Sequence, residues 1–512
     1  MWWRGALAGF VSAAFGLGVG ELVAGVDNDL LSPVIGVGNK AIDLVPVSLK
    51  TFAINTFGRN DKKALVVGML IAIAVFAVGV GVAAIRRPWV GYAGLTAFGL
   101  LGMAAAVEGR TGSTADAIPS LVAALVAMTS LMFLLRAVRG RPRPTSGNPV
   151  GEIVASDRRR FLFLIVSATA LAAGAAVLGR KLQSSTTAVA DRAKRLLPRA
   201  AKPLAVAAAD VEAAGLAATT PFFTPNKDFY RIDTALVVPR IDASKWSMTV
   251  KGMVTKPLTF SYEELLSRPL IERDITLTCV SNEVGGQLMG TARWVGVPLR
   301  ELLEEAGAKP SATQVVGRSV DGWTAGFPAS VVTDGRDAMV ALAMNGEPLP
   351  FAHGYPARLI VPGLYGYVSA TKWLESIEFT TLEAFDAYWV PRGYSKLAPI
   401  KQASRIDVPR GLATVAPGKT AVAGIAWAQR TGVSKVELQF DGGAWVEADL
   451  AAEQSIDTWR QWSFAWDATP GRHEIAVRST DKKGRLQTEK RTAPLPNGAT
   501  GWHAIIVLVN AS

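Results

Sequence analysis

Long apolar runs dominate the first 180 residues of the chain and do not recur after them. Four of these runs are long enough, or nearly so, to cross about 30 Å of hydrocarbon, and a fifth follows. The runs are Ala6 to Val26, Ala64 to Ile85, Trp89 to Val107, Ile118 to Val138 and Phe161 to Gly179. Residues 27–63 carry charges, Pro33 and Pro46, which predicts an external or interfacial loop. The pattern predicts a membrane domain with about five transmembrane helices over residues 1–180.

Basic residues near the apolar runs predict how the helices are oriented. They cluster at Arg4, at Arg86 and Arg87, and across Arg136 to Arg160. Because positive charges favour the cytoplasmic ends of spans, five alternating helices leave everything after Gly179 outside the cytoplasm. We therefore expect a multi-pass protein of the cell membrane whose soluble part is extracytoplasmic.

A short motif leads into the fifth apolar run. The segment Ser156-Asp-Arg-Arg-Arg-Phe-Leu162 resembles a twin-arginine export signal, with Arg158 and Arg159 as the pair. A positive cluster that flanks an ordinary span explains the same residues equally well. Both interpretations stay open on charge alone.

The soluble part begins with a different texture. Residues 181–220 are rich in Ala with scattered Lys and Arg, which predicts a helical or flexible linker. Short strand patterns then alternate with helical ones, which indicates an α+β domain over residues 221–399. The clearest are strands at Trp246 to Gly252 and Arg358 to Val361, and helices at Tyr262 to Ser267 and Leu299 to Ala306.

From residue 400 to residue 512 alternating strand patterns are separated by turn signals. The turns include Asp441-Gly-Gly443 and Thr469-Pro-Gly471. The strands are predicted at Thr420 to Trp427, Lys435 to Phe440, Trp459 to Trp466 and His473 to Ser479. This spacing predicts a β-sandwich of the immunoglobulin-like class.

Composition narrows the function. The chain has 54 Lys and Arg against 42 Asp and Glu, a net charge of +12, but much of the excess lies between the apolar runs. This location favours membrane topology over nucleic-acid binding. A single cysteine excludes an intrachain disulfide, a cysteine-ligated iron–sulfur cluster and c-type haem. The histidines, His353, His473 and His503, all lie in the soluble part, so a bis-histidine haem between the spans is excluded. Any redox chemistry therefore needs a separate electron-transfer partner.

The single cysteine lies in a setting that suits a cofactor. It belongs to Ile275-Thr-Leu-Thr-Cys-Val-Ser-Asn282, and Glu283, Gly285 and Gly286 follow. A thiolate at the end of a strand, beside a glycine-rich turn, can meet a bulky cofactor without obstruction. Composition alone favours a buried structural cysteine.

A second segment gathers polar side chains around an apolar strand. It runs from His353-Gly-Tyr-Pro-Ala-Arg358 to Ser369-Ala-Thr-Lys-Trp373. Arg358 can grip a phosphate bidentately and Lys372 can act as a point charge, which suits a phosphorylated ligand with hydrogen-bonding rings. The same cations could be solvated charges at a strand edge.

Together these segments resemble a known family. The run from Asn226-Lys-Asp-Phe-Tyr230 through Thr278-Cys-Val-Ser-Asn282 and Trp294-Val-Gly-Val-Pro-Leu299 to Trp373 is similar to the molybdopterin-binding domain of sulfite oxidases. The β-sandwich resembles the immunoglobulin-like domain that follows in many of these enzymes and often mediates dimerisation. A homodimer is thus one expected assembly, and the membrane segment lies outside the resemblance.

The resemblance implies a role for each matching residue. Cys279 would be the single protein ligand of molybdenum, whose other ligands come from one pyranopterin and from oxo or water groups. Cys279, Asn282 and Tyr230 would lie nearest the reaction. The cofactor would contact Asn226, Tyr230, Arg231, Ser319, His353, Arg358, Ser369, Thr371 and Lys372. The implied activity is two-electron oxygen-atom transfer to or from a small molecule.

Departures from the family pattern affect the expected substrate. Sulfite oxidases place an arginine shortly after the cysteine, whereas this chain has Asn282 and Glu283. Asp386 stands where they carry a tyrosine, although Tyr388 is nearby. Carboxylates near the metal would repel sulfite, so a neutral sulfoxide or N-oxide fits at least as well.

Two alternatives remain at this point. A sulfite dehydrogenase could take its anion-binding arginines from elsewhere, for example Arg293 or Arg392. A non-catalytic membrane-anchored interaction module could keep the fold without the chemistry. The intact cysteine and the phosphate-binding set favour an enzyme.

Overall fold

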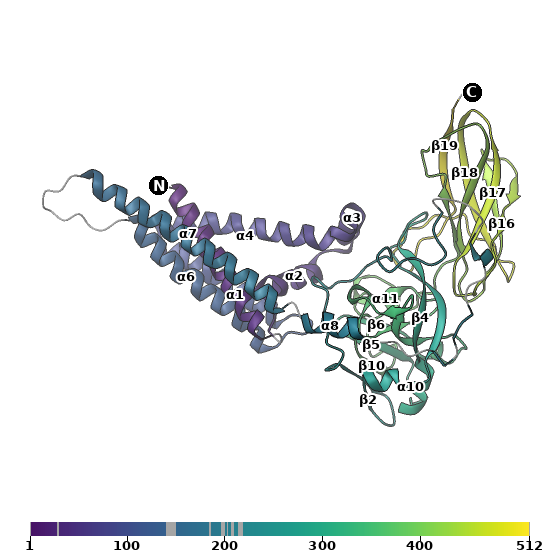
Figure 1. Ribbon diagram of the computed structural model, residues 1–512, viewed down its shortest axis with the longest axis horizontal. Helices are drawn as coiled ribbons and strands as arrows, with labels where there is room; N and C mark the ends of the chain where they lie inside the picture. Colours follow the sequence, from purple (N-terminus) through teal and green to yellow (C-terminus); the bar gives the residue numbers. More distant parts are fainter. Residues whose placement is uncertain are drawn as a thin grey trace. The chain divides into compact units, whose positions relative to one another are not determined.

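The computed structural model describes residues 2–27, 30–139, 150–183, 186–195, 200–201, 203–205, 209–212 and 219–510. The chain divides into two compact units (Figure 1). Unit 1 comprises residues 1–186 together with 234–238, and unit 2 comprises residues 187–233 and 239–512.

Unit 1 is built from long helices: α1 (Trp2–Val26), α4 (Asp61–Arg86), α5 (Pro88–Val107), α6 (Ala117–Arg139) and α7 (Val150–Gln183). Helix α1 packs against α4, α6 and α7. Small residues allow the close approach, since a Cβ atom on Gly9 would lie 2.1 Å from the carbonyl oxygen of Ala77 on α4.

Within the described residues, four helical segments are long and apolar enough to cross a membrane: Trp2–Val26, Asp61–Arg86, Pro88–Val107 and Thr114–Val138. They correspond to the first four predicted runs. The predicted fifth run lies within α7, where the apolar stretch Phe163–Gly179 is shorter than these four. Arg158 and Arg159 lie on α7 with side chains outside the described part of the chain, and residues 140–149 also lie outside it.

The expectation of a loop over residues 27–63 is wrong for most of that segment. It forms helices α2 (Pro33–Leu44) and α3 (Val47–Phe57), followed by the short helix η1 (Gly58–Asn60). Pro33 occupies the first turn of α2, where a missing N–H costs nothing, and the Ser32 hydroxyl caps that turn by accepting from the Ile35 amide. Pro46 lies between the two helices. The prolines therefore mark helix boundaries rather than a loop.

The first part of unit 2 contains two mixed sheets and short helices. One sheet has the order β2-β1-β10-β5-β6, in which only the β1–β10 pair is parallel among its described strands. Its strands are β1 (Ser247–Gly252), β2 (Leu258–Ser261), β5 (Gln314–Ser319), β6 (Thr324–Pro328) and β10 (Leu374–Thr380). The predicted helices are present as α9 (Tyr262–Leu266) and α10 (Leu299–Ala306).

The other sheet carries the site. Its order is β3-β4-β7-β8, and β9 also pairs with β7. The strands are β3 (Ile271–Thr278), β4 (Met289–Pro298), β7 (Met339–Met344), β8 (Glu347–Pro348) and β9 (Arg358–Ile360), and α11 (Gly366–Ser369) follows. Strand β7 is buried throughout, so this sheet lies in the core of the domain.

Part of the 181–220 segment that belongs to unit 2 lies against this domain. Helix α8 (Thr186–Lys194) places Arg192 so that its guanidinium donates to the Leu349 carbonyl at 2.8 Å. The Tyr355 hydroxyl donates to Asp191 at 2.8 Å. The short helix η3 (Ala209–Val211) joins an apolar cluster with Phe222 and Trp459.

Residues 403–509 form a β-rich region of two sheets, as the alternating pattern predicts. One sheet has the order β11-β13-β17-β16 and the other β12-β19-β18-β14-β15. The strands are β11 (Ala403–Val408), β12 (Thr414–Val415), β13 (Gly418–Trp427), β14 (Val433–Phe440), β15 (Trp445–Glu447), β16 (Asp449–Leu450), β17 (Arg460–Ala468), β18 (Gly471–Asp481) and β19 (His503–Val509). Val422 and Trp462 from one sheet share a buried cluster with Leu438 and Val477 from the other. Its immunoglobulin-like class stays a prediction.

Candidate active site

Cys279 directly follows β3 and is buried, with 8% of its surface exposed. Its amide donates to the Leu288 carbonyl at 2.9 Å, and its carbonyl accepts from the Asn282 amide at 3.0 Å. Residues 279–288 therefore form a tight loop that returns the chain to β4, with the thiol at its first position. Burial raises the pKa of the Cys279 thiol, and hydrogen bonds with Ser281 partly oppose this rise.

Asn282 holds this loop together. Its side-chain oxygen accepts from the Leu288 amide at 2.8 Å, and its amide nitrogen lies 3.9 Å from the Met289 sulfur. Gly286 leaves room for this arrangement, because a Cβ atom there would lie 2.6 Å from the Asn282 side-chain oxygen. The predicted catalytic residue Asn282 is thus engaged in shaping the loop.

Tyr230 lies close to the thiol. A Cβ atom on Gly366 would lie 3.8 Å from both the Tyr230 hydroxyl and the Thr278 carbonyl, so this hydroxyl lies near the end of β3. Burial raises the pKa of Tyr230, the Cys279 thiolate raises it further, and the positive charge of Arg358 opposes both. Tyr230 therefore lies near both Cys279 and Arg358.

Arg358, the first residue of β9, is a buried cation. Its Nη1 donates to the His353 carbonyl at 3.0 Å, and its guanidinium carbon lies 5.2 Å from the centroid of the Trp294 ring. Its Nε has no hydrogen-bond partner, and no carboxylate forms a salt bridge with it, among the described residues. Burial lowers the pKa of Arg358 to about 10. Such a group suits an anionic ligand.

His353 lies beside Arg358 and contacts Asn226. The His353 Nε2 lies 3.0 Å from the Asn226 carbonyl oxygen, and its ring packs edge-on against Phe229. Burial, reinforced by the charge of Arg358, lowers the pKa of His353 to about 4, so the imidazole is neutral at pH 7. The Asn226 side chain bonds to Glu347 and Asn345 rather than facing the thiol.

Lys372 and Arg231 share a carboxylate. The Lys372 Nζ lies 2.6 Å from Asp233, and the Arg231 Nε lies 2.8 Å from the same oxygen. Burial lowers the pKa of Lys372 to about 8, and Asp233 opposes the decrease. The Asp233 carboxylate thus partly neutralises the charge of Lys372 before any ligand binds. Arg358 has no such carboxylate partner among the described residues.

The predicted hydroxyl residues Ser319, Ser369 and Thr371 are all buried and all have protein partners. Ser369 donates to the Tyr365 carbonyl at 3.1 Å, and Thr371 lies 3.4 Å from the Gly317 carbonyl oxygen. The Ser319 hydroxyl accepts from the Asp321 amide at 3.4 Å. The contact with Gly317 places Thr371 beside β5, the strand of the other sheet that ends at Ser319.

Two tyrosines that the sequence did not single out also lie near enough to Cys279 for its charge to affect their pKa. Burial raises the pKa of Tyr365 to about 12, and Cys279 adds to the rise. Burial and Cys279 likewise raise the pKa of Tyr394, while a hydrogen bond with Ser281 lowers it. Tyr365 lies in the glycine-rich stretch before α11, so its position beside Gly366 was a usable signal. Tyr394 follows η6 (Val390–Arg392) and has no local motif.

Comparison with known proteins identifies the site's family. Residues 235–389 match the family described as oxidoreductase molybdopterin binding domain. The uncharacterized oxidoreductase YuiH of Bacillus subtilis is 35% identical over 153 residues, which cover 30% of this chain and 74% of that protein. The chain belongs to the sulfite oxidase-like family of molybdopterin-dependent oxidoreductases.

Two further similarities have a lower sequence identity. Human mitochondrial sulfite oxidase is 27% identical over 345 residues, which cover 57% of this chain and 63% of the human protein. The chain thus spans less than two thirds of the length of that relative. The solved structure of the sulfane dehydrogenase SoxCD from Paracoccus pantotrophus matches with a TM-score of 0.50 at 23% identity, covering 58% of this chain and 85% of that one. This likeness shows the fold.

The family implies a molybdenum–pyranopterin cofactor, and two buried polar atoms fit one. Arg358 Nε and Thr278 Oγ1 have no hydrogen-bond partner in the part of the chain that the structure describes. Leaving such atoms unsatisfied costs about 1–3 kcal/mol each, so a polar ligand that reaches them would remove this penalty. Thr278 is the last residue of β3, and Arg358 is the first residue of β9.

The cations that could bind sulfite are engaged elsewhere. Arg293 forms a two-point contact with Asp274, with both N–O distances at 2.8 Å. Arg392 donates to the Tyr388 carbonyl and lies 3.8 Å from the centroid of that ring. Asp386 pairs with Lys396 at 2.7 Å. These contacts give no support to an arginine-lined anion pocket beside Cys279.

Proposed function

We propose that this chain is a two-electron oxygen-atom-transfer enzyme whose molybdenum is bound by Cys279. The observation that carries the proposal is the group of Cys279, Tyr230 and Arg358, in which a buried thiol and a buried, unpaired guanidinium atom share one tyrosine neighbour. A thiolate is the soft ligand that molybdenum prefers, and it must bind deprotonated. The positive charge of the bound metal would stabilise the thiolate and so offset the effect of burial, which raises the pKa of this thiol.

The residues divide the remaining tasks. Arg358 would bind the anionic end of the pyranopterin with Nε. The neutral imidazole of His353 would add no second charge beside Arg358. Lys372 and Arg231 would add a weaker positive field, because Asp233 already lies between them. When bound, the cofactor supplies the oxygen-atom and electron chemistry, and the protein keeps one coordination position open to the substrate.

We propose a neutral oxygen-atom donor or acceptor, such as a sulfoxide or an N-oxide, as the substrate. Tyr230, Tyr365 and Tyr394 lie near the thiol and carry uncharged hydroxyls, since burial holds each pKa above its ordinary value. Hydroxyls can donate to an oxygen atom without requiring an anion. Because Arg293 is committed to Asp274, a sulfite dehydrogenase is the weaker alternative.

We further propose that unit 1 anchors the chain in the cell membrane and that unit 2 is extracytoplasmic. The four apolar helices support an anchor. The orientation follows from the basic residues together with a fifth crossing, which the apolar stretch Phe163–Gly179 of α7 would make. Electrons would pass to a separate partner. The β-rich region would be an immunoglobulin-like domain that permits a homodimer.

The decisive experiment is metal and cofactor analysis of the purified full-length protein. We expect close to one molybdenum and one pterin per chain, and turnover of a sulfoxide or N-oxide with an artificial electron carrier. Cys279→Ser should remove turnover while unit 2 keeps its thermal transition, because a hydroxyl replaces a thiolate poorly at this metal. Wild-type protein without stoichiometric metal would instead indicate a non-catalytic module. Fast turnover of sulfite alone would favour the dehydrogenase.

A further inference from the structure

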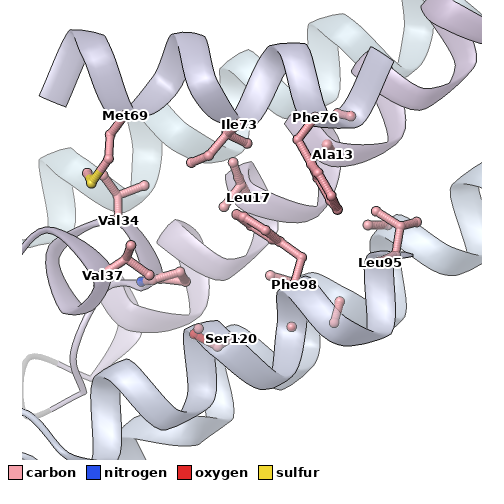
Figure 2. A pocket seen from close by; sticks show the side chains of 17 residues that line it. Ala13, Leu17, Val34, Val37, Met69, Ile73, Phe76, Leu95, Phe98 and Ser120 are labelled. Carbon is pink, nitrogen blue, oxygen red and sulfur yellow. The ribbon is translucent and has the colours of Figure 1, made fainter. Parts of the chain in front are cut away.

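Unit 1 contains an apolar pocket among α1, α2, α4, α5 and α6. Figure 2 shows the aliphatic and aromatic side chains that line it. The lining also includes Ser120, but its hydroxyl is buried against Gly102, where a Cβ atom would lie 3.2 Å from the Ser120 oxygen. The pocket therefore gives no chemical basis for choosing an occupant.

Helix α8, in contrast, contacts a segment of unit 2 that borders the candidate active site. This segment, residues 347–355, begins with β8 and ends shortly before β9. Arg192 donates to the Pro348 carbonyl at 2.6 Å and to the Leu349 carbonyl at 2.8 Å. The same guanidinium pairs with Glu347 at 3.0 Å. One side chain of α8 thus holds the first three residues of the segment.

Asp191 holds the other end of the 347–355 segment. The hydroxyl of Tyr355, which is fully buried, donates to Asp191 at 2.8 Å. Arg195 follows α8, donates to the same carboxylate at 2.8 Å and also pairs with Glu263. These contacts fix the Asp191 carboxylate in place. Helix α8 therefore holds the segment at both ends.

The middle of the 347–355 segment contacts the cations of the candidate active site. The Ala352 carbonyl accepts from the Lys372 Nζ at 3.3 Å, and the His353 carbonyl accepts from the Arg358 Nη1 at 3.0 Å. Gly354 packs tightly beside both cations, because a Cβ atom there would lie 3.1 Å from the Cβ atoms of Arg358 and Lys372. A shift of the segment would therefore disturb both side chains.

The sheet alone gives the 347–355 segment little support. Strand β8 lies at the edge of its sheet and pairs with β7 through two residues, Glu347 and Pro348. An edge strand leaves backbone groups without a partner in the sheet. The donors of Arg192 serve two carbonyls at this edge, so α8 supplies contacts that a further strand would otherwise make.

We propose that helix α8 retains the cofactor, with Arg192 and Asp191 as positioning residues that hold the 347–355 segment against Arg358 and Lys372. The inference rests on the proposed function, since it assumes that these two cations bind the pyranopterin. Arg192 and Asp191 act through the segment and do not need to touch the cofactor. Undocking of α8 frees the segment and speeds the release of the cofactor.

The test measures how fast molybdenum leaves the loaded full-length protein. Samples are passed over gel filtration at intervals, and molybdenum per chain is determined by mass spectrometry. Arg192→Met should speed the release about tenfold, because it removes charge-assisted hydrogen bonds to three acceptors. Tyr355→Phe should speed it about threefold, because it removes one hydroxyl and keeps the buried ring.

Arg268→Met is the matched control. Arg268 pairs with Glu305 at 2.7 Å, and its side chain is 22% exposed, as is that of Arg192. Arg268 forms no hydrogen bond with the 347–355 segment among the described residues, so its replacement should leave the release rate unchanged. Release from Arg192→Met that is no faster than from wild type, or no faster than from Arg268→Met, would overturn the inference.

Amide hydrogen exchange of the cofactor-free protein gives a readout that does not depend on molybdenum. Arg192→Met should speed exchange in the 347–355 segment and leave β7 unchanged. Equal acceleration in both would show a general loss of stability and would also overturn the inference. Unchanged release from loaded variants removes the retention role alone and leaves the proposed function standing. Wild-type protein that binds no molybdenum removes the proposed function itself and the retention role with it.

Discussion

Arg405 donates a hydrogen bond from Nη1 to the Gly286 carbonyl at 2.7 Å, so a strand of the β-rich region supports the loop that begins at Cys279. The same guanidinium pairs with Asp407 through Nε and donates to the Thr220 hydroxyl, and the side chain is buried. These three contacts hold the planar guanidinium of Arg405 in one orientation. The β-rich region thus contributes directly to the geometry of the candidate active site.

Replacing Arg405 should therefore impair the site more than the fold. Arg405→Met removes the bond to Gly286, and we expect a several-fold loss of turnover together with an altered electron paramagnetic resonance signal of the molybdenum. A charged-group hydrogen bond contributes about 1.5–3 kcal/mol, which is enough to loosen the loop. Arg478→Met is the control, since Arg478 lies on β18 and pairs with Glu437. If both variants behave alike, Arg405 stabilises the β-rich region only.

The same loop contains a glycine that no other residue should replace. Gly285 has φ +80°, and a Cβ atom there would lie 2.4 Å from the His503 Nε2. Gly346 has the same φ of +80° but no atom within 4 Å of an added Cβ. Gly346→Ala should cost about 1 kcal/mol from backbone strain, and Gly285→Ala a further ~1–3 kcal/mol from the clash. Thermal unfolding of the two variants measures this difference, and equal shifts would show that His503 moves aside freely.

The sequence predicts those site residues that lie next to a recognisable strand pattern. The thiol at the end of β3 follows from the apolar run before Cys279, and Arg358 follows from the strand pattern that it begins. Arg405 and Tyr394 could not be predicted, because their contacts with the Cys279 loop depend on how distant segments pack. The sequence analysis missed helices α2 and α3 because it interpreted the prolines as signs of a loop, whereas Pro33 is the first residue of a helix.

A surface pair in the β-rich region should make stability depend on pH. His473 Nδ1 lies 2.6 Å from Asp441, whose carboxylate raises the pKa of the imidazole. A raised folded-state pKa means that the stabilisation is present below the ordinary value of about 6.5 and is lost as pH rises through the folded pKa. Because Asp441 is half exposed, the effect should stay below about 1 kcal/mol.

His473→Gln is the variant that tests this pair. It should lower the melting temperature of the β-rich region at pH 5.5 and change it little at pH 8.5. The control His503→Gln removes a buried imidazole whose pKa burial lowers to about 4, so its effect should be similar at both pH values. A His473→Gln effect that is larger at pH 8.5 would contradict the assigned sign.

Arg358 should contribute more to cofactor retention than Lys372, although the sequence analysis placed both residues in one phosphate-binding set. Arg358 Nε has no partner within the described part of the chain, whereas Lys372 lies 2.6 Å from Asp233. Arg358→Met should remove most of the molybdenum that survives gel filtration, because the other cations of the site, Lys372 and Arg231, are already paired with Asp233. Lys372→Ala should lower the occupancy by a smaller factor, since Arg231 still pairs with Asp233. Molybdenum per chain by mass spectrometry measures both variants beside Cys279→Ser. A greater loss in Lys372→Ala would show that ligand binding separates Lys372 from Asp233, and the ranking of the two cations would then reverse.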